Sequence, residues 1–323
     1  MSDFFSSIQD IFINPSNGKD LKLITSQDKL LGLSERDNQF SLIDGVISFE
    51  DSINYTSNFG DQWNKFRRTQ IDSFNGTSLS ETRFFDATGW NREELEGKLV
   101  LDIGCGAGRF AEIALKYGAN VVAVDYSDAV YAAAKNLSRF NNLIIIKGNI
   151  YNLPFKKNIF DYIYCLGVIQ HTPDPEKAFK VLPSYLKSEG KFCADFYWKR
   201  MREYIKPKYY VRLITKYFKE DEIYRFLLKF HPAFYSLANL IYKIPVFGSW
   251  LVFLLPIKYY RGSYPQLNEQ QLYEWSLLDT YDNWAPTYDY PQTISSITKW
   301  ANESGLKKYR ILHAGHLVIR STK

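Results

Sequence analysis

Three glycines at a spacing of two are the residues of this chain best suited to hold a ligand. Gly104, Gly106 and Gly108 follow the apolar run Leu99–Ile103 and precede the amphipathic run Arg109–Tyr117. Glycine allows positive φ and lets a ligand approach the backbone closely. Ligands of open parallel sheets bind beyond the carboxyl ends of the strands, where this loop would lie. A tight strand–helix turn needs the same residues, so the glycines alone leave both interpretations open.

The neighbouring residues separate the ligand classes. A nicotinamide-binding loop has the spacing Gly-x-Gly-x-x-Gly, whereas its third glycine position is Arg109 here. A P-loop is excluded because no Gly-Lys-Ser/Thr follows the glycines. Asp125 ends the second apolar run, Val121–Val124, where a carboxylate can accept hydrogen bonds from ribose hydroxyls. The pattern therefore favours an adenosine-containing ligand other than NAD.

Four segments in order resemble the motifs of class I S-adenosylmethionine-dependent methyltransferases. They are Asp102–Gly108, Asp125, Gly148–Phe155 and Phe160–His171. The resemblance covers roughly residues 98–198 and is strongest to the group that includes ubiquinone and menaquinone methyltransferases and many small-molecule and glycan-modifying enzymes. It implies methyl transfer with S-adenosyl-L-methionine as the cofactor.

The resemblance also implies a set of cofactor-binding residues. They are Arg83, Asp102, Gly104, Cys105, Gly106, Asp125, Tyr126, Asn149, Ile150 and Leu166. Gly104 and Gly106 would line the methionine part of the cofactor. Asp125 would hold the ribose diol, and Tyr126 would cover one face of the adenine.

Four further residues receive roles from the same resemblance. Asn149 stands where the family usually has Asp bonded to the adenine amino group, and its amide oxygen can still accept that bond. Ile150 would pack on the adenine, and Leu166 would contact the methionyl group through its backbone. Arg83 would bind the cofactor carboxylate, or it is a surface helix residue.

His171 is the histidine that the sequence places at the catalytic edge, just after the run Tyr162–Cys165. A hydroxyl acceptor must lose its proton during methyl transfer, and imidazole titrates near neutrality. We therefore predict His171 as a general base. The alternative is that it caps the loop Thr172–Pro175 or packs beside the cofactor. Tyr288 and Tyr290 are candidate acceptor contacts.

Other reactive residue types do not form a site in the sequence. His313 and His316 have the spacing of half a metal site, but no cysteine or carboxylate pair accompanies them, so we predict a turn at a strand end and no metal. Cys105, Cys165 and Cys193 lie in or beside apolar runs, where small apolar packing is the expected role.

Alternating apolar runs and amphipathic segments predict the elements that position these residues. The strands are expected at Leu99–Ile103, Val121–Val124, Leu143–Ile146, Tyr162–Cys165, Lys191–Phe196, Tyr309–His313 and His316–Ile319, and the helices at Arg109–Tyr117, Asp128–Phe140, Glu176–Leu186 and Thr293–Ser304. Continuous apolar strands alternating with helices are typical of a parallel sheet covered on both faces. We predict an α/β fold with a doubly wound, mostly parallel, seven-stranded Rossmann-like sheet and a helical insertion before the last strands.

The regions outside this alternation suggest three further parts. Residues 1–50 would form a small flap with a hairpin at 40–49, or a metal-free remnant of a zinc ribbon. Residues 51–97 would form a helical lead-in, with Trp63 and Arg67 on one helix face as a lid or as packing on the sheet edge. Residues 98–198 and 291–323 would form the cofactor domain. Residues 199–290 would form a basic, aromatic cap that selects the acceptor.

Composition limits the classes of protein and of partner. The 323 residues include 46% apolar and 23% charged residues and three cysteines, which excludes a disordered chain and a disulfide framework. A net charge of +5 is too small to indicate nucleic acid. Between residues 199 and 261, however, 13 Lys/Arg stand against 4 Asp/Glu. Lys208, Arg212, Lys216 and Lys219 would share one helical face, which suits an anionic membrane surface or a solvated cap.

The N-terminus and the longest apolar run guide the expected location. Met1–Phe5 has no basic region followed by an apolar run, so it is not a secretory signal. The run Ser236–Pro256 is interrupted by Lys243, Pro245 and Gly248, so it does not resemble a membrane span. We predict a cytoplasmic protein with at most peripheral contact at the inner membrane face.

Three functions remain open from the sequence. The leading one is methyl transfer to a small-molecule or glycan-like acceptor at oxygen. The second is carbon methylation of a quinone-like, lipid-linked acceptor. The third is a catalytically silent cofactor-fold protein that binds a partner, which the intact glycine loop and Asp125 disfavour. The acceptor and the oligomeric state are not predicted.

Overall fold

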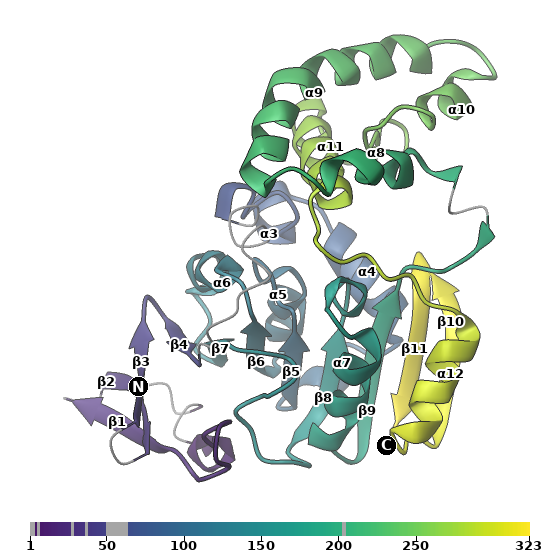
Figure 1. Cartoon of the computed structure of the whole chain (residues 1–323). Helices are drawn as coiled ribbons and strands as arrows, with labels where there is room; N and C mark the ends of the chain where they lie inside the picture. Colours follow the sequence, from purple (N-terminus) through teal and green to yellow (C-terminus); the bar gives the residue numbers. More distant parts are fainter. Residues whose placement is uncertain (1–3, 5–6, 27–28, 36–37, 50–63, 202–204) are drawn as a thin grey trace. The chain divides into compact units, whose positions relative to one another are not determined.

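The computed structural model describes residues 4, 7–26, 29–35, 38–49, 64–201 and 205–323 (Figure 1). The chain divides into two compact units. Unit 1 comprises residues 1–67, 78–198 and 288–323, and unit 2 comprises residues 68–77 and 199–287. Each unit is described separately below.

Unit 1 is built on one sheet of eleven strands within the described residues, in the order β1-β2-β3-β4-β7-β6-β5-β8-β9-β11-β10. The strands are β1 (Lys22–Ser26), β2 (Lys29–Glu35), β3 (Asn38–Ile43), β4 (Val46–Ser48), β5 (Leu99–Ile103), β6 (Asn120–Asp125), β7 (Leu143–Lys147), β8 (Phe160–Cys165), β9 (Leu186–Phe196), β10 (Lys308–Ala314) and β11 (His316–Thr322). The strands from β4 to β9 in this order pair in parallel, and the outer pairs on both sides are antiparallel.

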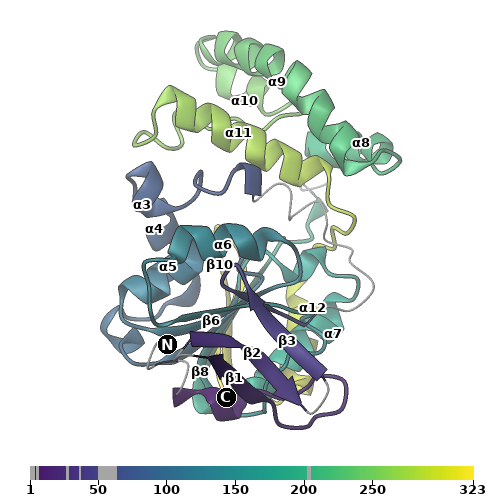
Figure 2. The same cartoon turned by 90° about the vertical axis from the view of Figure 1, so that its left-hand side faces the viewer.

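Helices cover both faces of this sheet (Figure 2). They are α4 (Leu79–Thr88), α5 (Arg109–Lys116), α6 (Ala129–Leu137), α7 (Pro175–Val181) and α12 (Ile294–Glu303). Helices α4, α5 and α6 pack on one face of the sheet through Phe84, Ala111 and Val130. Phe179 of α7 and Trp300 of α12 pack on the opposite face. The predicted Rossmann-like architecture is confirmed.

The number of strands and their mainly parallel pairing were predicted wrongly. The sheet has eleven strands and mixed pairing because the N-terminal residues extend it. The expected hairpin forms, with β3 antiparallel to β4 around Asp44 at φ 50° and Gly45 at φ 81°. The second strand of this hairpin then pairs in parallel with β7, placing Val46 beside Ile145. This pairing satisfies backbone groups that an edge strand would leave open.

The seven strands predicted from the sequence are all present, but β9 begins at Leu186 instead of Lys191, and the helix predicted before it is too long. Instead of continuing to Leu186, α7 ends at Val181 and is followed by a short 3-10 helix, η4 (Leu182–Tyr185), and then by β9. Pro183 explains the difference, because proline has no backbone N–H and cannot continue an α-helix.

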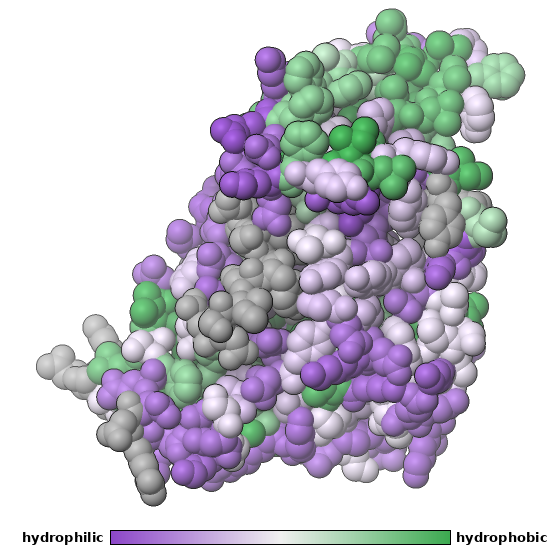
Figure 3. Space-filling model, in the orientation of Figure 1, coloured by the Kyte–Doolittle hydropathy of each residue, from purple (hydrophilic) through white to green (hydrophobic). Residues whose placement is uncertain are grey.

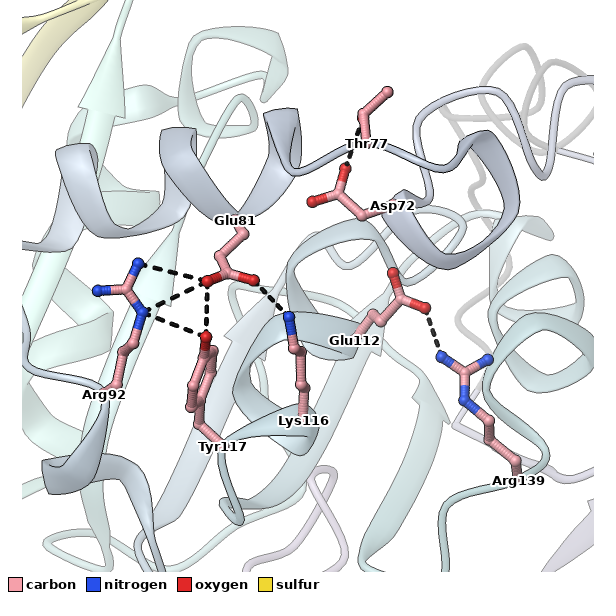
Figure 4. A network of polar contacts seen from close by, with 8 residues as sticks. All are labelled: Asp72, Thr77, Glu81, Arg92, Glu112, Lys116, Tyr117 and Arg139. Atoms are coloured by element: carbon pink, nitrogen blue, oxygen red, sulfur yellow. Dashed lines mark hydrogen bonds and ion pairs between the residues drawn. The ribbon is translucent and has the colours of Figure 1, made fainter. Parts of the chain in front are cut away.

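A carboxylate cluster joins α4 to the end of α5 (Figure 4). Glu81 accepts hydrogen bonds from Lys116 Nζ and the Tyr117 hydroxyl, each at 2.6 Å, and from Arg92 Nη2 at 3.3 Å. Burial acts to raise the pKa of Glu81, but these donors and the Lys116 charge lower it overall. A second pair, Arg139 with Glu112, stands beside it at 2.5 Å. Helix α4, which carries Arg83, is thereby held against α5.

Unit 2 is helical. It contains α3 (Asp72–Asn75), α8 (Pro207–Thr215), α9 (Glu220–Tyr242), α10 (Gly248–Val252) and α11 (Glu269–Trp284). Helix α9 packs against α10 and α11, with Tyr235, Ala238, Val252 and Ile257 in the shared core. The segment 68–77 joins this unit because Gln271 Nε2 donates to the Asn75 carbonyl at 2.8 Å.

The expected single basic face on one helix is wrong. Helix α8 ends at Thr215, Lys216 caps it, and Lys219 is the N-cap of α9. Lys208 and Arg212 are thus on a different helix from the residues that follow Lys219. Among the described residues, no helix has both the length and the apolar character needed to cross a membrane.

Candidate cofactor and catalytic site

The glycine loop between β5 and α5 cannot carry side chains at two of its positions. Gly104 has φ +75° and Gly108 has φ +89°. A Cβ atom at Gly104 would lie 2.2 Å from Val168 Cγ2, and one at Gly108 would lie 2.6 Å from Leu137 Cδ1. Both positions therefore require glycine, because the backbone has positive φ and packs directly against a neighbouring side chain.

Asp125 ends β6 and closes this loop from the side. Its Oδ2 accepts a hydrogen bond from the Gly106 amide at 2.9 Å. Its Oδ1 accepts from the Ser127 amide at 2.9 Å and from the Ser127 hydroxyl at 2.7 Å. The Tyr126 backbone donates to the same carboxylate, so backbone and hydroxyl donors of the adjoining loops hold Asp125 in place, and its contact with the ribose stays a prediction. Burial raises the pKa of Asp125, although the hydrogen bonds from Ser127 and Gly106 act in the opposite direction.

Asp102 lies in the interior of the unit, 2% exposed. It is paired in register with Tyr164 of β8, and the Tyr164 hydroxyl acts to lower the pKa of Asp102. Burial, together with the nearby Asp125 charge, raises the pKa of Asp102 to about 8. The residue is therefore largely protonated at neutral pH, and its direct contact with the cofactor stays a prediction.

The residues expected around the adenine follow β6 and β7. Tyr126 is half-buried next to Asp125, and Ile150 is buried. The Asn149 side-chain oxygen accepts a hydrogen bond from the Tyr151 amide at 3.0 Å. The bond of Asn149 with the adenine amino group stays a prediction. The parallel strands carry these residues to one edge of the sheet.

Arg83 is held in place by an acid that the sequence analysis did not single out. Its Nη2 lies 3.2 Å from Asp195 Oδ2, and the Gly167 amide donates to Asp195 Oδ1 at 2.5 Å. Asp195, near the end of β9, is 2% exposed, whereas the Arg83 side chain is 32% exposed. Arg83 is thus fixed beside the loop that follows Leu166. A charged residue inside the otherwise apolar run of β9 was the signal available in the sequence.

His171 and the two candidate acceptor residues come together. His171 lies in the 3-10 helix η3 (Ile169–His171), and its Nδ1 is 2.9 Å from the Tyr288 carbonyl oxygen. The Tyr290 amide donates to the Gln170 carbonyl at 2.9 Å, and the rings of Tyr288 and Tyr290 are stacked with centroids 5.8 Å apart. A carbonyl only accepts hydrogen bonds, so this geometry assigns the proton of a neutral ring to Nδ1 and the lone pair to Nε2.

Asn136 of α6 is another polar residue at the loop that the sequence analysis missed. Its side-chain nitrogen donates to the Ala107 carbonyl at 2.9 Å and to the Arg67 carbonyl at 2.7 Å. Arg67 Nη1 returns a hydrogen bond to Asn136 at 3.3 Å. The predicted lid partner, Trp63, lies outside the described residues.

The remaining reactive residue types have structural positions. His313 and His316 flank the turn between β10 and β11, as predicted. The three cysteines are free and buried, and burial raises the pKa of Cys105 and Cys165 well above the usual range. Their thiols are protonated at neutral pH and suit apolar packing. Within the described ranges, no three His, Cys, Asp or Glu side chains could hold a metal ion together.

Comparison with known proteins agrees with this geometry. Residues 101–194 match the family model of the methyltransferase domain. The ubiquinone biosynthesis O-methyltransferase of Coxiella burnetii is 37% identical over 99 residues, which cover 30% of this chain and 42% of that protein. The sterol 24-C-methyltransferase of Pneumocystis carinii is 34% identical over 116 residues, covering 34% of this chain and 30% of that protein.

A solved structure from Methanococcus maripaludis, provisionally described as an S-adenosyl-L-methionine-dependent methyltransferase, is 15% identical with a TM-score of 0.46. It covers 85% of this chain and 97% of that one. The chain spans less than half the length of the curated relatives it matches. The region that matches the family model contains the glycine loop, Asp125 and His171. The domain around residues 101–194 belongs to the class I S-adenosylmethionine-dependent methyltransferases.

Proposed function

We propose that this protein transfers a methyl group from S-adenosylmethionine to a hydroxyl oxygen of a small-molecule or glycan-like acceptor. The observation that supports oxygen as the acceptor atom is the contact between His171 Nδ1 and the Tyr288 carbonyl oxygen. It leaves the basic nitrogen of the neutral ring at Nε2. A hydroxyl acceptor needs such a base, because its proton must leave as the new bond forms.

The residues present fit the cofactor. The loop at Gly104 has no room for a side chain, and the Asp125 carboxylate beside it, fixed by the Gly106 amide, would bind the ribose. Asn149 would hold the adenine amino group, and Arg83 would hold the carboxylate of the methionine part. The Asp195 carboxylate would keep Arg83 in position. When bound, the sulfonium cofactor supplies an already activated methyl group.

The protein's part in the reaction is then positioning and proton removal. Tyr288 and Tyr290 would hold the acceptor so that its oxygen lies in line with the methyl group and the sulfur. The carbon–sulfur bond breaks, the carbon–oxygen bond forms, and His171 Nε2 takes the hydroxyl proton. Positioning of two reactants can contribute about 7–11 kcal/mol, and a general base about 10²–10⁴-fold in rate.

We propose that residues 199–290 select the acceptor. The chain leaves unit 1 directly after β9 and returns at Tyr288, and Trp198 forms a bridge with Gln292 within unit 1. Both connections therefore lie next to Tyr288 and Tyr290. A chimera carrying a different insertion should change the acceptor preference and leave cofactor affinity unchanged. An unchanged preference would contradict the proposal.

Carbon methylation of a quinone-like lipid is the second candidate. The relatives include both an O-methyltransferase and a C-methyltransferase. The large number of exposed apolar residues in unit 2 would suit an acceptor that resides in a membrane. A base is less necessary there when the attacking carbon is already electron-rich.

An isotope-labelled methyl group distinguishes the two candidates. The protein is incubated with methyl-labelled S-adenosylmethionine and with panels of glycosides, phenols and quinol-like lipids, and the product is analysed by NMR. We expect the label in the chemical-shift range of a methyl bound to oxygen. A label bound to carbon would favour the second candidate. Transfer to no hydroxylated acceptor would contradict the proposal of O-methylation.

A further inference from the structure

Unit 2 carries an unusual amount of apolar surface. Among the described residues, 19 of the 23 exposed large apolar side chains belong to this unit. Figure 3 shows hydrophobic side chains gathered over α8, α9 and α10. The most exposed on α9, α10 and the turn between them are Leu240 at 66%, Val246 at 87%, Phe247 at 65% and Trp250 at 62%. Contiguous apolar surface of this kind marks a site of interaction.

Helix α9 has separate buried and exposed apolar stripes. Its buried residues are Ile223, Leu227, His231, Tyr235 and Ala238, which recur every three or four positions. A second set, Phe226, Phe230, Leu237 and Leu240, is exposed at intervals of three, four or seven positions and continues beyond the helix to Ile244. The first stripe completes the core of unit 2. The second is not required for that core and extends into the turn that leads to α10.

The charge of the same region is one-sided. No Asp or Glu occurs between Ile223 and Asn268, whereas Lys229 and Lys243 lie on or directly after α9, and Arg225 of the same helix pairs with Asp221. Lysines also alternate with aromatic residues. The ammonium of Lys216 lies 4.9 Å from the Tyr217 ring centroid, and that of Lys229 lies 5.4 Å from the Phe230 ring centroid. This surface would attract a negatively charged partner.

We infer that this surface of α8, α9 and α10 docks onto an anionic lipid membrane. Exposed Trp, Phe and Tyr next to lysines suit the boundary between headgroups and acyl chains. Anionic lipids attract each basic residue near the surface. The cores of protein–protein interfaces, in contrast, are depleted in lysine. No helix in the described part of the chain could span the bilayer, so the contact is peripheral.

The test uses the full-length chain without cofactor, in co-sedimentation with vesicles. One set is phosphatidylcholine alone, and the other contains an equal share of phosphatidylglycerol. We expect binding to the anionic vesicles at low salt and a marked loss at high salt, because salt screens the basic residues. No binding to anionic vesicles at low salt would overturn the inference.

Matched variants separate the surface from general hydrophobicity. Phe247→Ser/Trp250→Ser should weaken vesicle binding by roughly tenfold or more, because two exposed aromatic side chains no longer enter the lipid. The control, Ile43→Ser/Ile294→Ser, alters two exposed apolar residues of unit 1 and should bind as wild type does. Equal binding by the Phe247/Trp250 variant and the wild type would overturn the inference.

A charge variant and the oligomeric state complete the test. Lys216→Glu/Lys229→Glu/Lys243→Glu should remove the preference for anionic vesicles, and a retained preference would count against the inference. Circular dichroism checks that each variant is folded. If the wild type ignores vesicles but is a dimer that Phe247→Ser/Trp250→Ser makes monomeric, the surface joins two copies of the chain instead. Because no cofactor or acceptor is present, the result is independent of the proposed methyl transfer.

Discussion

The two units use their apolar residues in opposite ways. In unit 1 only four large apolar side chains of the described residues are exposed, whereas unit 2 exposes nineteen. The sheet of unit 1 has helices on both faces, so its strands are buried between them. In unit 2 the core formed by α9, α10 and α11 uses one stripe of α9 and leaves another in solvent. Unit 1 thus buries its large apolar residues between layers, whereas unit 2 presents many of them to solvent.

The largest expected effect concerns the chemistry of unit 1. His171→Ala should lower turnover by about 10²–10⁴-fold, the usual contribution of a general base, and change cofactor affinity little. Leu240→Ser in unit 2 should leave cofactor affinity unchanged. Steady-state kinetics and calorimetry measure both quantities. Turnover near wild type in His171→Ala would remove the residue from the mechanism and weaken the assignment of chemistry to unit 1.

The second expected effect is a decrease in the free energy of unfolding of unit 1 as pH rises. Burial raises the pKa of Asp102 from 3.8 to about 8, so the native state keeps a proton that the unfolded chain releases. The free energy of unfolding therefore falls between about pH 4 and pH 8, by at most ~1.4 kcal/mol per pH unit from this group.

Asp102→Asn removes this dependence, because the amide does not titrate. Urea unfolding at several pH values should show a smaller loss of stability towards pH 8 in the variant than in the wild type. Tyr164→Phe controls for the neighbouring hydroxyl, which acts to lower the pKa of Asp102, and should keep the dependence. Parallel pH profiles for Asp102→Asn and the wild type would contradict the assignment.

The stability of unit 2 should depend on pH in the opposite sense, and the change in free energy of unfolding should be smaller. His231 Nε2 lies 2.9 Å from the Ser276 hydroxyl oxygen, and burial lowers the pKa of His231 from 6.5 to about 4. The unfolded chain takes up a proton that the native state resists, so stability is lost as pH falls through this window, by up to ~3 kcal/mol. His231→Gln should flatten this loss in calorimetric melting. A variant as sensitive to acid as the wild type would show that another group is responsible.

The smallest expected effect is the change in stability when a charge cluster of each unit is disrupted. Glu81→Gln should destabilise unit 1 by about 1–3 kcal/mol, because Lys116, Tyr117 and Arg92 lose a charged acceptor. Asp221→Asn breaks an exposed pair with Arg225 in unit 2, where such pairs contribute about 0.2–1 kcal/mol. Melting temperatures should fall clearly in the first variant and hardly in the second. An equal change in both would contradict the role of the Glu81 cluster.

Unit 1 can be predicted well from the sequence because a sheet buried on both faces requires continuous apolar strands that alternate with amphipathic helices. The positions of β5 to β11, the hairpin around Gly45 and the loop at Gly104 all follow from local patterns. The pairing of β4 with β7 does not, because nothing near residues 46–48 indicates a partner about 100 residues away. Asp195 was missed for a similar reason: its partner, Arg83, is distant in the chain.

Unit 2 shows what the sequence could not reveal. Helix α9 has apolar residues on several sides, a pattern typical of a buried helix. Leu227 is nevertheless covered and Leu240 is exposed, and this difference depends on tertiary packing that the sequence pattern does not specify. The association of 68–77 with α11 is also invisible in the sequence, since it rests on hydrogen bonds such as that from Gln271 to Asn75.

Titration of S-adenosylmethionine by calorimetry tests most directly that the cofactor site belongs to unit 1 and is separate from the surface of unit 2. Three proteins are compared: the wild type, Asp125→Ala, and Phe247→Ser/Trp250→Ser. We predict wild-type affinity in the Phe247/Trp250 variant and a loss of roughly 10–100-fold in Asp125→Ala, since a hydrogen bond to a charged group contributes about 1.5–3 kcal/mol. NAD should give no heat with any of them. Binding of NAD but not S-adenosylmethionine by the wild type, or undiminished S-adenosylmethionine binding in Asp125→Ala, would contradict the account.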